Sequence, residues 1–200
     1  MNVYVETNFV LELVFEQEQW FVCEQILTAC QEASNFELII PAYCLAEPNE
    51  KLRRQAGQRE ELQKNLSIEM RQLSRSQSYS ERISRVAEIS SLLAQSTADE
   101  RERFDFYRNR ILHIAQVIPL TSDVLRQSAF YEQQYKLTPQ DALVYTSVIL
   151  HLAAKTPMNC CFLNKNAKDF SKPSMIEELE SYQCKMIPRF DQGLEFIQAA

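Results

Sequence analysis

Four acidic side chains stand at positions from which a carboxylate could take part in catalysis. Glu6 ends a first apolar run, Glu47 lies in a short helical stretch after a second, and Asp141 is near the start of an apolar helix. Asp169 follows a further apolar run. Carboxylates in one cleft repel each other unless a hard divalent cation neutralises them, and oxygen sites without histidine favour Mg²⁺ or Mn²⁺. Because such an ion activates water, these residue types predict metal-dependent hydrolysis of a phosphodiester.

Each of these acids also has a purely structural interpretation. Glu6 could complement the dipole of the helix that follows it, and Glu47 could be an exposed helix residue. Asp141 would be the third residue of a helix capped by Thr138, where a carboxylate favours the helix without any catalytic role. The catalytic interpretation therefore depends on whether the acids converge in space.

Short apolar runs separated by helical segments predict the elements that would position these acids. The runs are Asn2 to Glu6, Glu37 to Ile40, Val117 to Thr121, Cys160 to Leu163 and Lys185 to Pro188. This alternation predicts one α/β domain over residues 1–200, a three-layer doubly wound fold around a parallel sheet of about five strands. Ligands collect beyond the carboxyl ends of such strands, so the acids that follow them are expected to meet there.

The region 49–114 differs from the rest because it is polar and has helical spacing without a strand candidate, which predicts a helical insertion. Ser78 to Glu81 and Thr97 to Glu100 fit capping boxes, so helices are expected to restart near residues 79 and 98. Residues 49–85 contain nine Lys and Arg and five Asp and Glu, which gives this segment a net charge of +4. Because the whole chain has a net charge of -6, the remaining residues have a net charge of -10. Two interpretations stay open: a solvated helix pair with i,i+4 ion pairs, or a basic arm that holds RNA phosphates.

Composition excludes several other classes of function. The net charge of -6 and the pI of about 5.1 argue against a protein that coats nucleic acid through bulk positive charge. The six cysteines lack metal-site spacing and are expected to be reduced core residues, and the two histidines lie in apolar helical settings and are expected to be structural. A first segment without a basic leader, and apolar runs too short to span a bilayer, predict a soluble, cytoplasmic protein without a membrane partner.

In the order of its motifs, the chain resembles the PIN-domain family. That family has an acid-x-Asn after the first strand, a Glu on the second helix, an Asp that begins a later helix and an Asn-x-x-acid-Phe run. The matching segments here are Glu6-Thr7-Asn8, Glu47, Asp141 in DALVYTSVIL, and Asn166-Ala167-Lys168-Asp169-Phe170. The resemblance implies a PIN-like fold and an endoribonuclease that uses Mg²⁺ or Mn²⁺, related to the toxins of toxin–antitoxin pairs.

The resemblance also implies roles for individual residues. The metal would be held by Glu6, Glu47, Asp141 and Asp169, and supported by Asn8, Asn164 and Asn166. RNA phosphates are expected to meet Arg53, Arg54 and Lys165. The family usually has Asp where this chain has Glu6, and one added methylene moves a carboxylate by roughly an ångström.

That substitution leaves an alternative open, a catalytically weakened PIN-like module that binds RNA or a protein. A scaffold whose long helices pack against a partner is a third interpretation, and its sign would be an apolar stripe on the insertion. That stripe would consist of Leu62, Leu66, Leu73, Ile83, Val86, Ile89 and Leu93. The sequence leaves open whether an antitoxin or another protein partner exists and whether the chain forms a homodimer.

Overall fold

The central element of the protein is a parallel β-sheet. We analysed a computed structural model, which describes residues 1–33, 35–79, 84–156 and 159–199. Within these residues the sheet has five strands in the order β3-β2-β1-β4-β5. They are β1 (Asn2–Val5), β2 (Glu37–Pro41), β3 (Gln116–Ile118), β4 (Cys160–Leu163) and β5 (Cys184–Ile187). The predicted three-layer α/β fold is confirmed, and each strand lies within a few residues of its predicted run.

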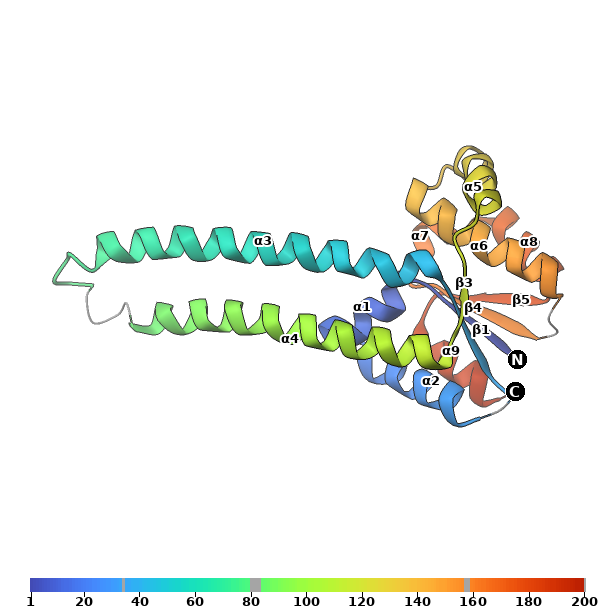
Figure 1. Cartoon of the computed structure of the whole chain (residues 1–200), viewed down its shortest axis with the longest axis horizontal. Helices are drawn as coiled ribbons and strands as arrows, with labels where there is room; N and C mark the ends of the chain where they lie inside the picture. The colour runs from blue at the N-terminus through green and yellow to red at the C-terminus, as the bar shows by residue number, and fades with distance from the viewer. Residues whose placement is uncertain (34, 80–83, 157–158, 200) are drawn as a thin grey trace.

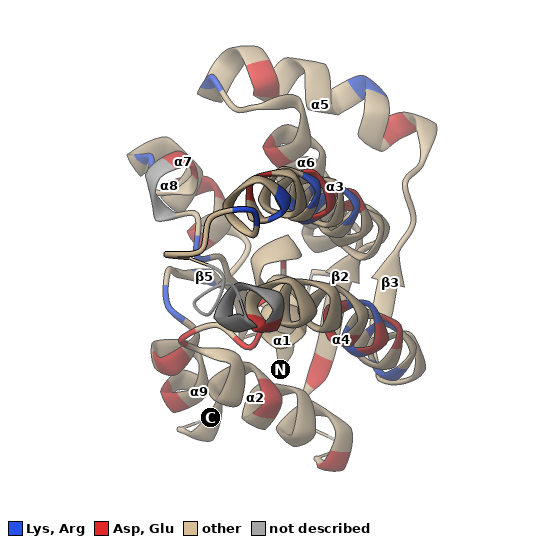
Figure 2. Cartoon of the chain, turned by 90° about the vertical axis from the view of Figure 1, so that its left-hand side faces the viewer, with Lys and Arg blue, Asp and Glu red and all other residues tan. Residues whose placement is uncertain are grey.

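Helices cover both faces of this sheet. They are α1 (Thr7–Phe15), α2 (Trp20–Glu32), α5 (Ser122–Tyr135), α6 (Pro139–Lys155), α7 (Ala167–Phe170), α8 (Pro173–Ser181) and α9 (Phe190–Gln198), besides the two long helices described below. In Figure 2, α2 and α9 lie on one side of the sheet, and α5, α6 and α8 lie on the other. Every residue of β4 is buried, because a parallel strand covered on both faces has two apolar sides.

The core confirms the prediction for the cysteines. All six belong to the described residues, and each is buried with a free thiol. They lie among the apolar side chains of the strands, of α2 and of the first turn of α3, where a free cysteine acts as a small hydrophobic residue. His151 is half-buried on α6 and shares a hydrogen bond of 2.8 Å between its Nδ1 and the Tyr4 hydroxyl, which agrees with a structural role.

The two long helices α3 (Ala42–Leu73) and α4 (Ser84–Ile114) lie side by side and project from the sheet as an arm, as Figure 1 shows. Arg59 on α3 donates two hydrogen bonds, of 2.7 and 2.6 Å, to the Glu100 carboxylate on α4. Gln63 donates to the Ser90 carbonyl oxygen at 2.7 Å. The predicted helical insertion is therefore the outer part of two helices that begin and end at the sheet.

Two details of the predicted insertion need correction. Glu47 was expected on a short helical stretch disturbed by Pro48, whereas α3 continues through Pro48, which is buried. The restart near residue 98 is also wrong, because α4 is continuous there and the Thr97 hydroxyl donates to the Leu93 carbonyl oxygen within the helix. Part of the other capping box, Ser78 to Glu81, lies outside the described residues.

The apolar stripe predicted on the insertion is only partly covered. Leu62, Leu73 and Ile89 are exposed, while Leu66 and Leu93 are half-buried. The remaining two positions of the stripe, 83 and 86, lie outside the described side chains. Among the described helices, none combines the length and the apolar character that crossing a bilayer requires.

Candidate active site

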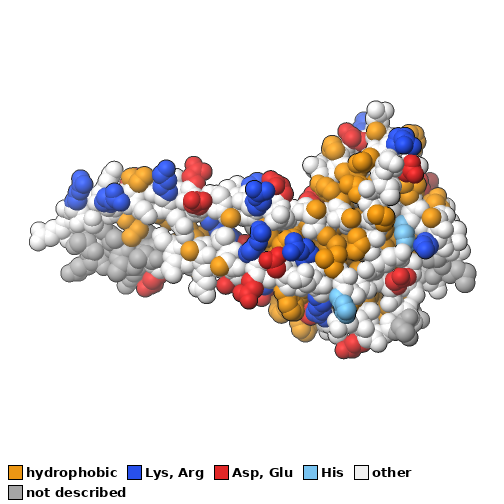
Figure 3. Space-filling model, viewed as in Figure 1, with side chains coloured by type: hydrophobic (Ala, Val, Ile, Leu, Met, Phe, Trp, Pro, Cys, Tyr) orange, Lys and Arg blue, Asp and Glu red, His pale blue; other side chains and the backbone are white. Residues whose placement is uncertain are grey.

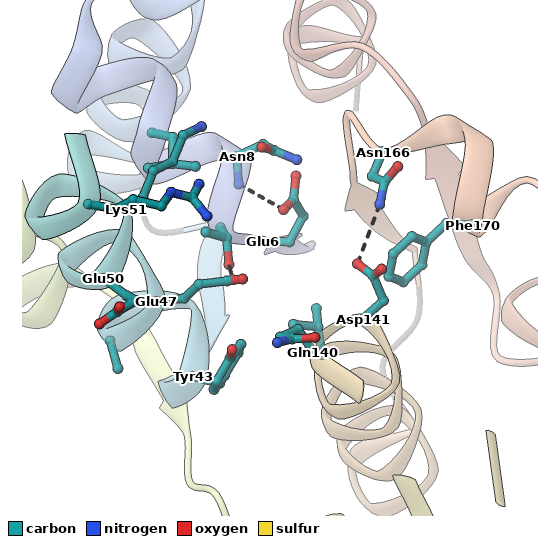
Figure 4. A pocket seen from close by; sticks show the side chains of 15 residues that line it. Glu6, Asn8, Tyr43, Glu47, Glu50, Lys51, Gln140, Asp141, Asn166 and Phe170 are labelled. Atoms are coloured by element: carbon teal, nitrogen blue, oxygen red, sulfur yellow. Dashed lines mark hydrogen bonds between the residues drawn. The ribbon is translucent and has the colours of Figure 1, made fainter. Parts of the chain in front are cut away.

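A cavity of about 560 Å³ opens where β1 leads into α1, close to the first turns of α3 and α6. Glu6, Glu47 and Asp141 all line it, although they come from three different elements. In Figure 4 their carboxylates point toward the same space, with Glu6 and Glu47 on one side and Asp141 on the other. The structure thus brings together three of the four acids singled out in the sequence.

Glu6 is the N-cap of α1 and is only 5% exposed. Its Oε2 accepts a hydrogen bond of 2.7 Å from the Asn8 main-chain N–H, and its Oε1 accepts one of 3.4 Å from the Lys165 N–H. Burial raises the pKa of this carboxyl to about 7, although the hydrogen bonds from Asn8 and Lys165 work in the opposite direction. At neutral pH, a nearby cation would therefore favour the ionised form.

Glu47 is half-buried in the second turn of α3. The Thr7 hydroxyl donates a hydrogen bond to its Oε2, which ties this helix to the first residue of α1. Thr7 is itself buried. One carboxylate oxygen is thus fixed by α1, and the side chain is held toward the cavity.

Asp141 is the third residue of α6 and combines a capping contact with a place in the cavity. The Thr138 hydroxyl accepts from the Asp141 N–H at 3.2 Å and donates to its Oδ2 at 2.6 Å. The other oxygen, Oδ1, accepts from the Asn166 side-chain amide at 3.4 Å. The structural and the catalytic interpretations of Asp141 are therefore compatible.

The loop between β4 and α7 carries the asparagines of the predicted site. Asn166 and Asn8 line the cavity, whereas Asn164 is 1% exposed and is not part of the lining. The Asn164 side-chain oxygen accepts from the Asn166 N–H at 2.8 Å, which shapes the turn. Its amide nitrogen has no hydrogen-bond partner among the described residues.

Asp169 is the acid that the structure does not bring to the cavity. It is a half-buried residue of α7, and it is not among the residues that line the cavity, although its neighbour Phe170 is. The main-chain N–H of Asp169 donates to the Asn166 carbonyl oxygen at 3.2 Å. A role of Asp169 as a metal ligand stays a prediction.

Comparison with known proteins shows the family of this chain. The sequence profile of the PIN domain matches residues 3–170, which is most of the chain. The chain belongs to the PIN-domain family. A search of curated proteins found no match to this PIN domain. The structure of the chain is similar to that of a chain in the crystal structure of VapBC2 from Rickettsia felis bound to a DNA fragment from their promoter. The TM-score is 0.43 and the sequence identity 11%, and the match covers 94% of this chain and 98% of that one.

Proteins with a PIN domain are generally nucleases that use divalent metals. The side chains around the cavity can therefore be compared with the ligands that such a metal prefers. Of the side chains that the structure describes, no three from acids, cysteines or histidines are grouped closely enough to hold an ion as they lie. The donors around the cavity are nevertheless carboxylate and amide oxygens, which suit a hard cation. Mg²⁺ keeps several waters and is usually bound through one or two carboxylates, so these residues fit it chemically.

The cations around this PIN domain only partly match those predicted for RNA contact. Arg54 lines the cavity, whereas Arg53 is exposed on α3 and is not part of the lining. The Lys165 ammonium instead pairs with Glu12, a buried acid of α1. Sequence reasoning missed Lys51, which lines the cavity one helical turn after Glu47, and that i,i+4 spacing was the available signal.

Glu12 is a further residue that the sequence reasoning missed. It is 1% exposed and holds both Lys165 and the Gln19 main-chain N–H, the latter at 2.8 Å from its Oε2. A single glutamate within the otherwise apolar stretch FVLELVF was the signal for a buried acid. The ion pair anchors the loop whose Lys165 N–H faces Glu6.

Proposed function

We propose that this PIN domain is a metal-dependent endoribonuclease that hydrolyses RNA phosphodiester bonds in the cavity between α1, α3 and α6. The observation that carries the proposal is the convergence of Glu6, Glu47 and Asp141, from three separate elements, on one cavity that Lys51 and Arg54 also line. These three carboxylates, with Glu50 as a fourth in the lining and no histidine, suit Mg²⁺ or Mn²⁺, and the two cations beside them suit a phosphate.

In this proposal each side chain has a defined task. Mg²⁺ or Mn²⁺, when bound, supplies a Lewis acid that activates water and offsets the charge developing on the phosphate. Glu6, Glu47 and Asp141 hold the ion, directly or through its waters. The contacts from Thr7 to Glu47 and from Asn166 to Asp141 restrict the direction in which those carboxylates point.

The remaining residues of the cavity bind and orient the substrate. Lys51 and Arg54 lie on the α3 wall and would receive the phosphate groups on either side of the scissile bond. Asn8 and Asn166 carry amides that can orient water or a ribose hydroxyl. Asp169 as a fourth ligand, and an antitoxin or other protein partner, also stay proposals.

The test is cleavage of a mixed pool of single-stranded and structured RNA by the purified chain in Mn²⁺ or Mg²⁺. Cleavage is expected to stop in EDTA and to fall in Asp141→Asn by more than the roughly 10–100-fold that losing an outer-shell partner costs. Asp123→Asn, which changes an exposed acid of α5, is the matched control and is expected to cleave normally. Cleavage that survives in EDTA or in a folded Asp141→Asn would refute the proposal.

A second function is favoured by two observations: no three acids of the described residues lie close enough together to hold an ion as they stand, and Glu6 takes the place of the usual aspartate. In that case the chain is a catalytically weakened module that binds RNA or a protein. Such a module would bind RNA without divalent ions and would never turn it over. Wild type and Asp141→Asn that are folded, bind RNA equally and are equally inert would select this function.

A further inference from the structure

A row of cations follows one face of α3 beyond the cavity. It consists of Arg53, Lys64, Arg71 and Arg75, all of them exposed, and we call these four residues the cation row. At about 100° per residue, the three members within the helix fall within about 20° of one another, and Arg75 follows just beyond the end of α3. The sequence spacing and the helix geometry together place Arg53, Lys64 and Arg71 on one line.

This line lies to the side of the helix surface that contacts α4. Arg59 and Gln63, which contact α4, are centred about 110° round the helix from the cation row. In Figure 3, Lys and Arg side chains recur along the arm from its tip to its junction with the sheet. The cation row therefore lies on solvent-facing surface of the arm and is not needed to hold the two helices together.

The members of the cation row also lack acidic partners. None of the four forms an ion pair with a described residue. On α4 the opposite holds, because Arg101, Arg103, Arg108 and Arg110 are each paired with an acid. Exposed cations contribute little to the stability of a fold. Stability therefore does not explain why four unpaired cations share one face of an acidic protein.

The cation row begins next to the cavity in sequence and runs outward along α3. Lys51 and Arg54 line the cavity and lie about 120° round the helix from the cation row, whose first member Arg53 directly precedes Arg54. Arg71 lies about 27 Å beyond Arg53 along α3 at 1.5 Å per residue. A stacked nucleic-acid strand has one phosphate per roughly 3.4 Å, so this length corresponds to about 8 phosphates. Glu60, on the same side of the helix, is the one acid close to the line, and the four cations outweigh it.

We propose that the cation row binds the backbone of a single-stranded RNA whose other end lies in the cavity. One line of charges on one helix suits one phosphate backbone, and the unpaired ammonium and guanidinium groups provide the attraction. The proposal rests on the proposed nuclease function and deepens it, because it makes the substrate an RNA long enough to reach from the cavity along the arm. Contacts to phosphates carry no base specificity.

The test compares the wild-type chain with the triple variant Lys64→Gln, Arg71→Gln and Arg75→Gln, which leaves the cavity and Arg53 unchanged. Fluorescence anisotropy in EDTA measures the binding of two single-stranded RNAs, one of about 4 and one of about 16 nucleotides. These lengths are the lower and upper ends of the usual range of single-strand binding sites. The matched control removes three positive charges elsewhere on the surface, as Arg126→Gln, Lys155→Gln and Arg189→Gln.

For the longer RNA, the triple variant is expected to lower the slope of log affinity against log salt by about 2, because each lost phosphate contact contributes about 0.7. At about 0.1 M salt this corresponds to a dissociation constant raised about 100-fold. The short RNA, and the control variant with either RNA, are expected to bind like wild type.

Equal binding of the longer RNA by wild type and triple variant would overturn the proposal and leave a protein as the partner of the cation row. An equal loss in the control variant would also overturn it. Cleavage assays in Mn²⁺ separate this outcome from failure of the proposed function. If the wild-type chain binds the longer RNA more tightly than the triple variant does but never cleaves RNA, only the proposed nuclease function is refuted. If the wild-type chain cleaves RNA and the triple variant binds the longer RNA equally well, only the role of the cation row is refuted.

Discussion

The ion pair between Glu12 and Lys165 gives an asymmetric prediction for stability. The Glu12 side chain is 1% exposed, whereas that of Lys165 is 36% exposed. Lys165→Met therefore leaves a carboxylate buried with only the Gln19 N–H as a donor, and we expect a loss of about 3–5 kcal/mol in the free energy of unfolding. Glu12→Gln leaves an ammonium that water can reach, and the loss is expected to be about 1–2 kcal/mol.

Urea unfolding at neutral pH, followed by circular dichroism, measures both single variants and the double variant Glu12→Gln with Lys165→Met. The double variant is expected to be more stable than Lys165→Met alone, because it no longer contains an unpaired buried charge. Equal losses in the two single variants, or a double variant that loses the sum of both, would refute the reasoning from burial.

Two further predictions concern single positions. A Cβ added at Gly193 would lie 2.6 Å from Cδ2 of the buried Leu163, so Gly193→Ala is expected to lower the free energy of unfolding in urea by about 1–3 kcal/mol. A Cβ added at Gly57 on α3 would have nothing within 4 Å, so Gly57→Ala is expected to raise that free energy by up to about 1 kcal/mol. The opposite order of stabilities would contradict the packing. Burial, and then Lys155, lowers the pKa of His151, so the unfolded chain binds this proton more readily. The stability that neutral His151 contributes is full above about pH 6.5 and falls as the pH drops below it, whereas Glu6, with its raised pKa, acts in the opposite direction. Between about pH 7 and pH 5, the thermal stability of His151→Phe relative to wild type should therefore rise as the pH falls, and a difference that does not change with pH would show that His151 does not titrate in this way.

The strands could be predicted from the sequence because both of their faces are buried. Runs such as Cys160 to Leu163 are apolar without alternation, which is what a parallel sheet covered on two sides requires. Glu6 and Asp141 could be placed for a related reason, since each lies at the boundary of an element whose end was readable. The convergence of these two acids then followed from the topology of the sheet.

Other features depend on contacts that no local pattern contains. Thr97 to Glu100 matches a capping box, but α4 continues there because Glu100 is held by Arg59 from the neighbouring helix. Lys165 was expected to meet RNA, and its partner Glu12 lies more than 150 residues earlier in the chain. Sequence spacing alone cannot reveal a partner that only the fold brings close.

The measurement that tests the central claim most directly is a crystal structure of the chain soaked in Mn²⁺, with anomalous diffraction used to locate the ion. The account predicts an anomalous peak inside the cavity, within coordination distance of carboxylate oxygens of Glu6, Glu47 or Asp141 or of the waters they bind, and no such peak in Asp141→Asn. A wild-type cavity without a peak at saturating Mn²⁺, or a peak that persists unchanged in Asp141→Asn, would contradict it.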